Sequence, residues 1–207
     1  MLFYIQQYFK RKIPFIKGFV FRILFSSERF IIGKNFQCDT FPSFIINKNC
    51  KIIIGRNVQF RRNVELRSHG TSCINIGNNT RIDRGVRILA ANNSEVIIKE
   101  GARVGLYSVF NGGSDIYVGE KALVSGFVYL QTSMHNHKKG INVQDQGFSH
   151  APVRLEKDTW LGAHVVVLPN CTIGEGAVVG SNAVVTKSIE AHTIFGGIPA
   201  KEINKRK

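Results

Sequence analysis

Aliphatic residues recur at every sixth position through the last third of the chain. From Leu155 the sequence divides into LEKDTW, LGAHVV, VLPNCT, IGEGAV, VGSNAV and VTKSIE, and each hexad opens on Leu, Ile or Val. This period matches neither a helix, at about 3.6 residues, nor an alternating strand, at about 2. Strands of a sandwich do not keep a six-residue frame through their turns. We therefore predict a stack of short repeats, with one inward aliphatic side chain in each hexad.

Turn-forming residues follow these aliphatic positions, and we expect them to supply the positive-φ corners between short strands. They are Gly162, Gly174, Gly176, Gly180, Asn170 and Asn182.

The same array begins earlier in the chain, in longer units. Isoleucines that open a dipeptide recur every 22 residues, at Ile32, Ile54, Ile76 and Ile98. Val118 follows Ile98 after 20 residues. Each unit fits an eighteen-residue coil with extra residues at one corner, where the sequences SHGT, ANNS and NGGS favour turns. We predict about seven coils, with one widened edge that lines the binding face.

One long segment interrupts the array. Val118 and Leu155 are 37 residues apart, so that after one coil about nineteen residues, from Gln131 to Ala151, lie outside the stack. A polar excursion of this size is costly to order and is usually kept for function. It contains three of the six histidines, His135, His137 and His150.

Composition narrows the partners only in part. The 207 residues are 43% hydrophobic, enough for one domain, and carry a formal charge of +14. An anionic partner is implied, which could be coenzyme phosphates, a nucleotide sugar, a phospholipid surface or nucleic acid. We do not expect nucleic acid, because the Lys and Arg residues are spread along the chain without a known binding motif. The four cysteines form no CxxC pair, which favours reduced thiols in the cytoplasm.

Residues 1–25 differ from the rest of the chain, being rich in aromatic, aliphatic and basic residues and free of acids. Charges interrupt the apolar run too often for a transmembrane span of about 20 residues. We predict two short helical pieces, broken near Pro14 and Gly18. Two roles stay open: the segment lies on the inner membrane leaflet, or it packs across the first coils or onto a neighbouring subunit.

The segments DTWLGAHVVVLPNCTIGEGAVVGSNAVVTKSI, FGGIPAKEI and MHNH resemble those of the hexapeptide-repeat acyltransferases. This family includes galactoside, maltose, streptogramin and surface-polysaccharide acetyltransferases. The resemblance implies an all-β fold, a left-handed parallel β-helix, and a homotrimer with active sites between subunits. We therefore expect a helical segment over 1–30, the β-helix over 31–190 with an active-site loop at 131–151, and a tail over 191–207.

The resemblance also implies a general base at His135, with His137 as the rival. An imidazole, with an unperturbed pKa of about 6.5, can take the proton of an acceptor hydroxyl as it attacks acetyl-CoA. Direct attack without an acyl-enzyme fits a chain that has no GxSxG nucleophile motif. Met134 stands where many relatives have an acid or a small polar residue; Asp145 and Glu156 are the candidate carboxylate partners of the base.

Further positions follow from the same resemblance. Asn111 and His137 are the expected acceptor-binding residues, although Asn111 beside two glycines also reads as a turn residue. The expected coenzyme site includes Ala163, whose N–H would face the thioester oxygen, and two lysines for the phosphates, which equally well face solvent. Its members are Trp160, Gly162, Ala163, Gly180, Ser181, Lys187 and Lys201.

The sequence therefore predicts a cytoplasmic O-acetyltransferase that uses acetyl-CoA without a metal and acts on a sugar or glycan in surface-polysaccharide biosynthesis. N-acetylation of a nucleotide-linked amino sugar is the main alternative. A γ-class carbonic anhydrase is disfavoured by the spacing of His135, His137 and His164. A non-catalytic β-helix that binds an anionic polymer is the remaining alternative.

Overall fold

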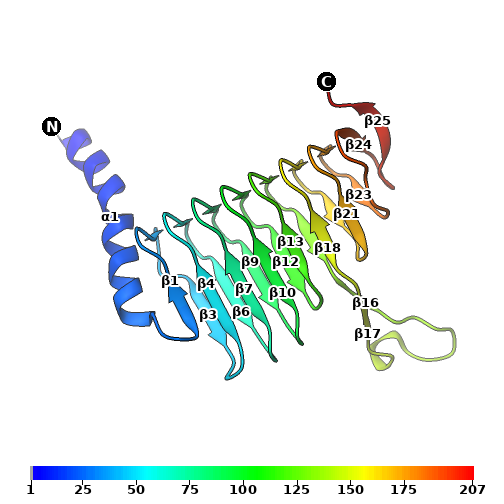
Figure 1. The fold of residues 1–207 in the computed structure, drawn as a ribbon, viewed down its shortest axis with the longest axis horizontal. Coiled ribbons are helices and arrows are strands. Elements are labelled where there is room, and N and C mark those ends of the chain that lie inside the picture. The colour runs from blue at the N-terminus through cyan, green and yellow to red at the C-terminus, as the bar shows by residue number, and fades with distance from the viewer. Residues whose placement is uncertain (1) are drawn as a thin grey trace.

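The computed structural model describes the chain from Leu2 to Lys207, except for the side chains of residues 3, 5, 8, 10 and 11. Helix α1 (Leu2–Phe25) precedes a column of seven stacked coils, and the described chain ends in a short antiparallel pair of strands (Figure 1). Each coil contributes one strand to each of three parallel sheets. The parallel β-helix predicted from the sequence is confirmed.

The three sheets form the sides of the column. The first sheet consists of β1 (Phe30–Ile32), β4 (Lys51–Ile54), β7 (Cys73–Ile76), β10 (Glu95–Ile98), β13 (Ile116–Val118), β18 (Val153–Leu155) and β21 (Cys171–Ile173). The second consists of β2 (Gln37–Cys38), β5 (Gln59–Phe60), β8 (Arg81–Ile82), β11 (Arg103–Val104), β14 (Leu123–Val124), β19 (Trp160–Leu161), β22 (Val178–Val179), β24 (Thr193–Gly196) and β25 (Lys201–Lys205). The third consists of β3 (Ser43–Ile46), β6 (Glu65–Ser68), β9 (Arg87–Ala90), β12 (Val109–Gly112), β15 (Tyr129–Gln131), β20 (Val166–Val167) and β23 (Val184–Val185).

The register of the first sheet explains the sequence spacing. The isoleucines that recur every 22 residues are direct partners on successive strands, from Ile32 through Ile54 and Ile76 to Ile98. Val118 pairs with Leu155 although 37 residues separate them, so the intervening segment leaves and rejoins the stack at one level. All six aliphatic residues that open the hexads are buried in the column: Leu155, Leu161, Val167, Ile173, Val179 and Val185.

Asparagine and glycine turn many of the corners. Asn35, Asn57 and Asn79 all have φ near +57°, and their side chains form a ladder: Asn35 Nδ2 donates to Asn57 Oδ1 at 3.0 Å, and Asn57 Nδ2 donates to Asn79 Oδ1 at 3.0 Å. Asn and Gly tolerate this left-handed conformation better than other residues do. Near the C-terminal end, the predicted positive-φ positions are confirmed for Asn170, Gly176 and Asn182.

The prediction is wrong for Gly162, Gly174 and Gly180, which do not have a positive φ. At two of them the close stacking of coils accounts for the glycine. A Cβ on Gly162 would lie 2.6 Å from the Ser181 nitrogen, and one on Gly174 would lie 2.5 Å from the Ala191 nitrogen.

Helix α1 is continuous, with Pro14 inside it, so the predicted division into two pieces is wrong. Gly18 is the point where the helix backbone crosses the first coil, because a Cβ there would lie 1.9 Å from the Phe36 carbonyl oxygen. Phe21 is fully buried against the rings of Phe25, Phe30, Phe36, Phe41 and Phe44. This tertiary packing overrides the local tendency of proline to break a helix.

We predict that Phe21→Ala lowers the free energy of unfolding by about 3–5 kcal/mol, because it opens a cavity in a buried aromatic cluster. Phe19→Ala, on the exposed side of the same helix, is the matched control and should change it by less than about 0.5 kcal/mol. Urea unfolding followed by circular dichroism measures both, and equal effects would contradict the capping role of Phe21.

Candidate active site

The predicted excursion is a hairpin that projects from the column between β15 and β18 (Figure 1). It is built from β16 (Ser133–His135), a short 3-10 turn η1 (Val143–Asp145) and β17 (Phe148–His150). The two strands pair antiparallel, with Ser133 opposite His150 and His135 opposite Phe148. The hairpin leaves the edge between the third and first sheets.

The same edge carries the widened corners predicted from the sequence. The segments 69–72, 91–94 and 113–115 all connect a strand of the third sheet to the next strand of the first sheet. The hairpin therefore continues, one coil later, a row of loops stacked along one side of the column. A hollow of about 510 Å³ lies there, lined by Asn92, Asn93, Ser94, Gly113, Ser114, Asp115 and His150.

His135 is exposed on the hairpin, and its ring packs on Phe148 with 4.1 Å between ring centroids. The cross-strand pairing places this aromatic ring where it limits the orientation of the imidazole. His137 is also exposed. Its Nδ1 donates a hydrogen bond to the His135 carbonyl oxygen at 3.1 Å. In the neutral ring, the other nitrogen, Nε2, is then the hydrogen-bond acceptor. Both histidines line a hollow of about 430 Å³ with Lys138.

The base of the hairpin holds a polar pair that the sequence did not reveal. Ser133 Oγ lies 2.9 Å from His150 Nδ1, at hydrogen-bond distance. The pair sits against Gly113, where a Cβ would lie 2.1 Å from Ser133 Oγ. The only signal in the sequence was the glycine pair of NGGS one coil before the excursion.

The predicted acceptor residue Asn111 lies on β12, half-buried, one coil before the hairpin. Its Nδ2 donates to the Tyr129 hydroxyl at 3.2 Å, and its strand partner on β15 is Gln131. Gln131 Nε2 in turn donates to the Ser133 carbonyl oxygen at 2.9 Å. Asn111 is therefore part of a strand and not of a turn. Its strand partner Gln131 connects it to Ser133, the first residue of β16.

The predicted coenzyme residues gather on other sides of the column. Gly162 and Ala163 turn the corner from the second to the third sheet, and Gly180 and Ser181 turn it one coil later. The Asn182 N–H donates to the Ala163 carbonyl oxygen at 2.9 Å, which holds the two corners together. Lys187 follows β23 and Lys201 opens β25, and both are exposed.

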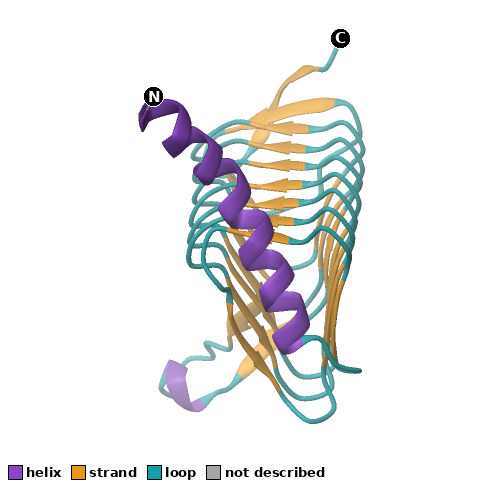
Figure 2. Cartoon of the chain, turned by 90° about the vertical axis from the view of Figure 1, so that its left-hand side faces the viewer, coloured by secondary structure: helices purple, strands orange, loops and turns teal. Residues whose placement is uncertain are grey.

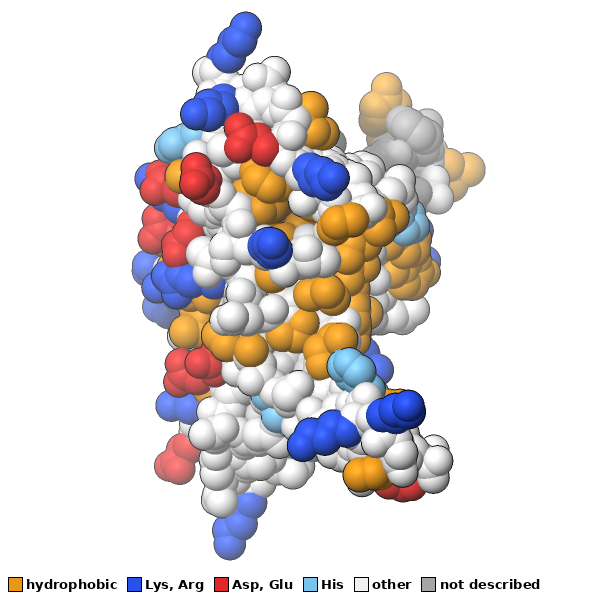
Figure 3. Space-filling view, turned by 90° about the vertical axis from the view of Figure 1, so that its right-hand side faces the viewer, with side chains coloured by type: hydrophobic (Ala, Val, Ile, Leu, Met, Phe, Trp, Pro, Cys, Tyr) orange, Lys and Arg blue, Asp and Glu red, His pale blue; other side chains and the backbone are white. Residues whose placement is uncertain are grey.

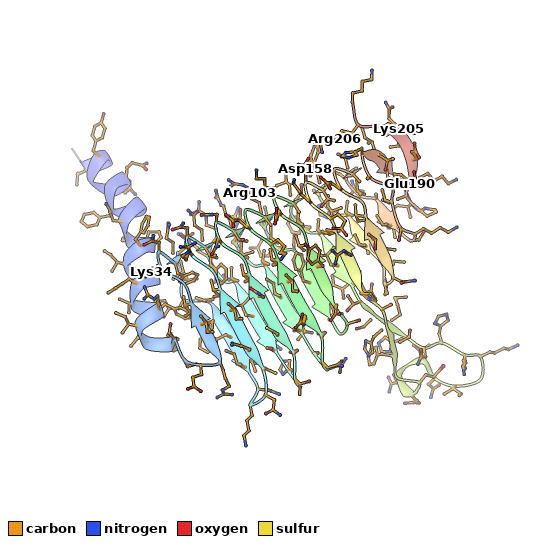
Figure 4. The ribbon with its side chains drawn as sticks, viewed as in Figure 1. Lys34, Arg103, Asp158, Glu190, Lys205 and Arg206 are labelled. Carbon is orange, nitrogen blue, oxygen red and sulfur yellow. The ribbon has the colours of Figure 1, made fainter. Side chains whose placement is uncertain are left out.

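Trp160 lies on the second sheet, half exposed, and its Nε1 donates to Ser125 Oγ at 3.2 Å. It borders a hollow of about 780 Å³ that is also lined by Arg103, Lys121, Asp158 and Arg206. Arg103, Asp158 and Arg206 follow one edge of the column in Figure 4. Arg103 and Lys121 of this hollow were not predicted from the sequence.

Arg206, near the C-terminus, is held by contacts with residues distant in the sequence. Its Nη1 contacts the Asp158 carboxylate at 2.8 Å and donates to the Gly176 carbonyl oxygen at 3.1 Å. No sequence pattern marks a contact between positions 48 residues apart.

The two candidate carboxylate partners of the base bond elsewhere. Glu156 pairs with Arg154, whose guanidinium also stacks over the Tyr117 ring at 3.8 Å. Asp145 accepts a hydrogen bond from Asn142 Nδ2 at 3.0 Å within the hairpin. Within the described residues, the contact with the Phe148 ring is therefore the interaction that orients the His135 ring.

The cysteines are unsuited to act as nucleophiles. All four are free; Cys38, Cys50 and Cys171 are buried, and Cys73 is half-buried. Burial raises the pKa of Cys38 to about 11, against the opposing effect of the Lys17 charge. Burial also raises the pKa of Cys171 above its usual value. A thiol that stays protonated at neutral pH is a poor nucleophile.

Comparison with known families and proteins agrees with this architecture. Residues 152–187 match the family described as bacterial transferase hexapeptide (six repeats). The chain is 28% identical to WbbJ of Escherichia coli, named for O-acetyl transfer in lipopolysaccharide biosynthesis, over 81% of this chain and 85% of that protein. It is 38% identical to Rv3034c of Mycobacterium tuberculosis, named as an acetyltransferase, over half of this chain but only 35% of that protein's length.

Two solved structures share the fold. The N-acyltransferase AntD of Bacillus cereus, in complex with dTDP and 3-hydroxybutyryl-CoA, superposes with a TM-score of 0.59 at 22% identity, over 97% of this chain and 88% of that one. The polySia-specific acetyltransferase NeuO superposes with a TM-score of 0.52 at 20% identity, over 86% and 88%. The chain thus has a parallel β-helix fold with hexapeptide repeats over residues 152–187, and the relatives that it matches in sequence are named as acetyltransferases.

We predict that Cys38 and Cys171 of the folded protein react at least about tenfold more slowly with a disulfide reagent at pH 8 than they do in 6 M guanidinium. The raised pKa keeps them protonated at this pH, whereas an unfolded cysteine with a pKa of about 8.5 is partly ionised. The rate for Cys38 should rise as the pH approaches 11. Rapid labelling of both in the folded protein at pH 8 would contradict their assignment as buried, inert thiols.

Proposed function

We propose that the protein is an acetyl-CoA-dependent O-acetyltransferase that acts on a sugar hydroxyl in surface-polysaccharide biosynthesis. The observation that carries the proposal is a histidine-bearing hairpin at one level of a hexapeptide-repeat column. The similarity to WbbJ over most of both chains supports the acceptor class, since that relative is named for O-acetyl transfer in lipopolysaccharide biosynthesis.

His135 acts as the general base in this proposal. Its imidazole takes the proton of the acceptor hydroxyl while the oxygen forms a bond to the acetyl carbonyl carbon. The carbon–sulfur bond then breaks, and the departing thiolate of coenzyme A takes the proton back from the imidazolium. The backbone N–H of Ala163 would stabilise the negative charge on the carbonyl oxygen.

The positions of these groups favour catalysis between subunits. The hairpin leaves the edge between the third and first sheets, whereas Ala163 and Gly180 lie at the corner between the second and third. A homotrimer could bring the hairpin of one chain to the corner of the next. We propose this assembly, which has a mass of about three times 23.1 kDa.

We place the reaction in the cytoplasm and propose contact with the inner membrane face through residues 1–25. None of the helices in the described part of the chain is long and apolar enough to cross a bilayer.

We predict that His135→Ala lowers the rate of thiol release from acetyl-CoA by about 10²–10⁴-fold, the usual contribution of a general base. A panel of sugar and glycan acceptors would be tested at saturating coenzyme. His137→Ala, on the same hairpin, tests the rival position and should lower the rate by less than about tenfold, because it removes a contact to the acceptor and not the base. Unchanged turnover in His135→Ala excludes the assigned role, and a large loss only in His137→Ala transfers that role to His137.

The same assay distinguishes the alternative acceptor class. An O-acetyl product is removed by mild alkali, whereas the N-acetyl product of a nucleotide-linked amino sugar is stable under those conditions. Turnover only with amino sugars, giving an alkali-stable product, would contradict O-acetylation while keeping the histidine base.

We predict partial complementation between two inactive variants, because each site needs groups from two chains. Chains with His135→Ala, mixed and reassembled 1:1 with chains carrying Trp160→Ala, should regain about a quarter of the wild-type activity, since one interface in four then joins two intact halves. Each variant reassembled alone is the control. No recovery, with trimers confirmed by light scattering, would show that both residues serve a site within one chain.

A further inference from the structure

The outward face of α1 is apolar. The helix lies across the end of the column (Figure 2), with Gly18 and Phe21 turned toward the first coil. On the opposite side, four large side chains are between 60% and 64% exposed: Ile16, Phe19, Ile23 and Leu24. Their spacing of three, four and one residues places them on one face of the helix.

An apolar outer face is unusual for an element that closes a stack of repeats. Terminal caps normally present polar residues to solvent, because nothing packs on their outer side. A contiguous exposed apolar patch indicates an interaction site. The packing of Phe21 already explains why the helix is attached, but it does not explain why the opposite face is apolar.

The helix is also basic. Its sequence contains five Lys and Arg residues and no Asp or Glu. Lys17 donates from Nζ to a backbone carbonyl, that of Asp39, at 2.8 Å. The other end of the molecule differs, because acidic side chains stand among the basic ones there (Figure 3).

A cationic hollow adjoins the helix on the side of the second sheet. Between α1 and the strands is a space of about 780 Å³ lined by Ile13, Phe15 and Lys17 from the helix and by Arg61 and Arg62 from the second coil. A neighbouring space of about 390 Å³ is lined by Asp39, Arg61, Arg62, Arg81, Asp83 and Arg84.

The arginines of this hollow outnumber its acids. Arg61 contacts Asp39 at 3.4 Å, and the Asp83 carboxylate accepts the backbone N–H of Arg84 at 2.7 Å. Arg81 is the direct strand partner of Arg103, so two like charges stand side by side along the second sheet. Such an arrangement is relieved by an anionic partner.

The charges stand close enough to the helix to act with it. Successive coils are about 4.8 Å apart, so Arg81 and Arg84, on the third coil, stand about 10 Å beyond the first. The outward face of α1 lies a further helix diameter of about 10 Å away, so Arg81 and Arg84 stand about 20 Å from a surface that touches this face. Their attraction for it is therefore long-range and depends strongly on salt, since the Debye length is about 8 Å at physiological ionic strength and about 30 Å at 0.01 M.

A second copy of the chain fits this face less well than a lipid surface does. A symmetric contact of α1 with α1 would bring two acid-free basic helices together, and their like charges would repel. An anionic bilayer meets both features, since its acyl boundary accepts apolar side chains and its headgroups attract Lys and Arg.

We propose that α1 lies in the plane of an anionic membrane. Ile16, Phe19, Ile23 and Leu24 enter the acyl boundary, and the arginines of the adjoining hollow add a long-range attraction to the anionic surface. The column then stands away from the bilayer. This proposal rests on the membrane contact proposed above and names the residues that make it. Membrane binding and acetyl transfer are measured separately, so failure of one proposal does not decide the other.

The test is co-sedimentation of the full chain with vesicles of phosphatidylglycerol and phosphatidylcholine (1:3), and with phosphatidylcholine alone. Wild type should bind the anionic vesicles at least about tenfold more strongly. The variant Ile16→Gln/Phe19→Gln/Ile23→Gln should lose at least about tenfold in binding, because three apolar side chains no longer enter the bilayer. The matched control Ile141→Gln/Val143→Gln/Ile203→Gln changes three exposed apolar residues elsewhere and should bind as wild type does. Circular dichroism confirms that each variant is folded.

The arginines have a separate signature. At 0.01 M salt, where the Debye length is about 30 Å, Arg81→Gln/Arg84→Gln should weaken binding to anionic vesicles about fivefold, and this difference from wild type should disappear at 0.15 M salt. Lys138→Gln/Lys157→Gln, two exposed lysines outside the hollow, is the matched control and should have no such effect.

Three outcomes would overturn the proposal. The first is equal binding of the α1 variant and wild type, and the second is equal binding to both kinds of vesicle. The third is a combined result: wild type does not bind vesicles, and the α1 variant differs from wild type in oligomeric mass when measured by light scattering. That result would show that a second copy of the chain covers this face.

Discussion

In-register stacking of the coils is the constraint on which the rest of this structure depends. Each short strand makes its hydrogen bonds to the coil before and after it, so no coil is stable alone. The inward aliphatic side chains supply the buried surface, and corner residues such as Asn57 bond to their counterparts one coil away. Side chains at equivalent positions therefore stand in rows along the column, and any loop inserted at one corner lines up with the others.

This geometry divides the candidate site between edges. The loops and the hairpin with His135 follow one edge, while Gly162 and Gly180 follow another and Trp160 lies on a face. A rigid column cannot bend to bring them together. The proposed homotrimer would complete the site by placing the hairpin of one column beside the corner of the next.

The open end of the column raises a different problem. Its first coil has no preceding coil, and α1 covers it through a cluster of phenylalanines around Phe21. That packing uses one face of the helix and leaves Ile16, Phe19, Ile23 and Leu24 exposed on the other face. The same helix thus completes the hydrophobic core and presents a surface suited to a membrane.

The sequence by itself determined the repeat, the number of coils, the widened edge and the place of the hairpin. These features depend on periods and spacings along the chain, as the pairing of Val118 with Leu155 across the excursion illustrates. Only the tertiary structure decided that α1 is continuous through Pro14, that Ser133 meets His150, and that Arg206 binds Asp158. Each of these depends on contacts between groups distant in sequence, whose energies outweigh local preference and leave no periodic trace.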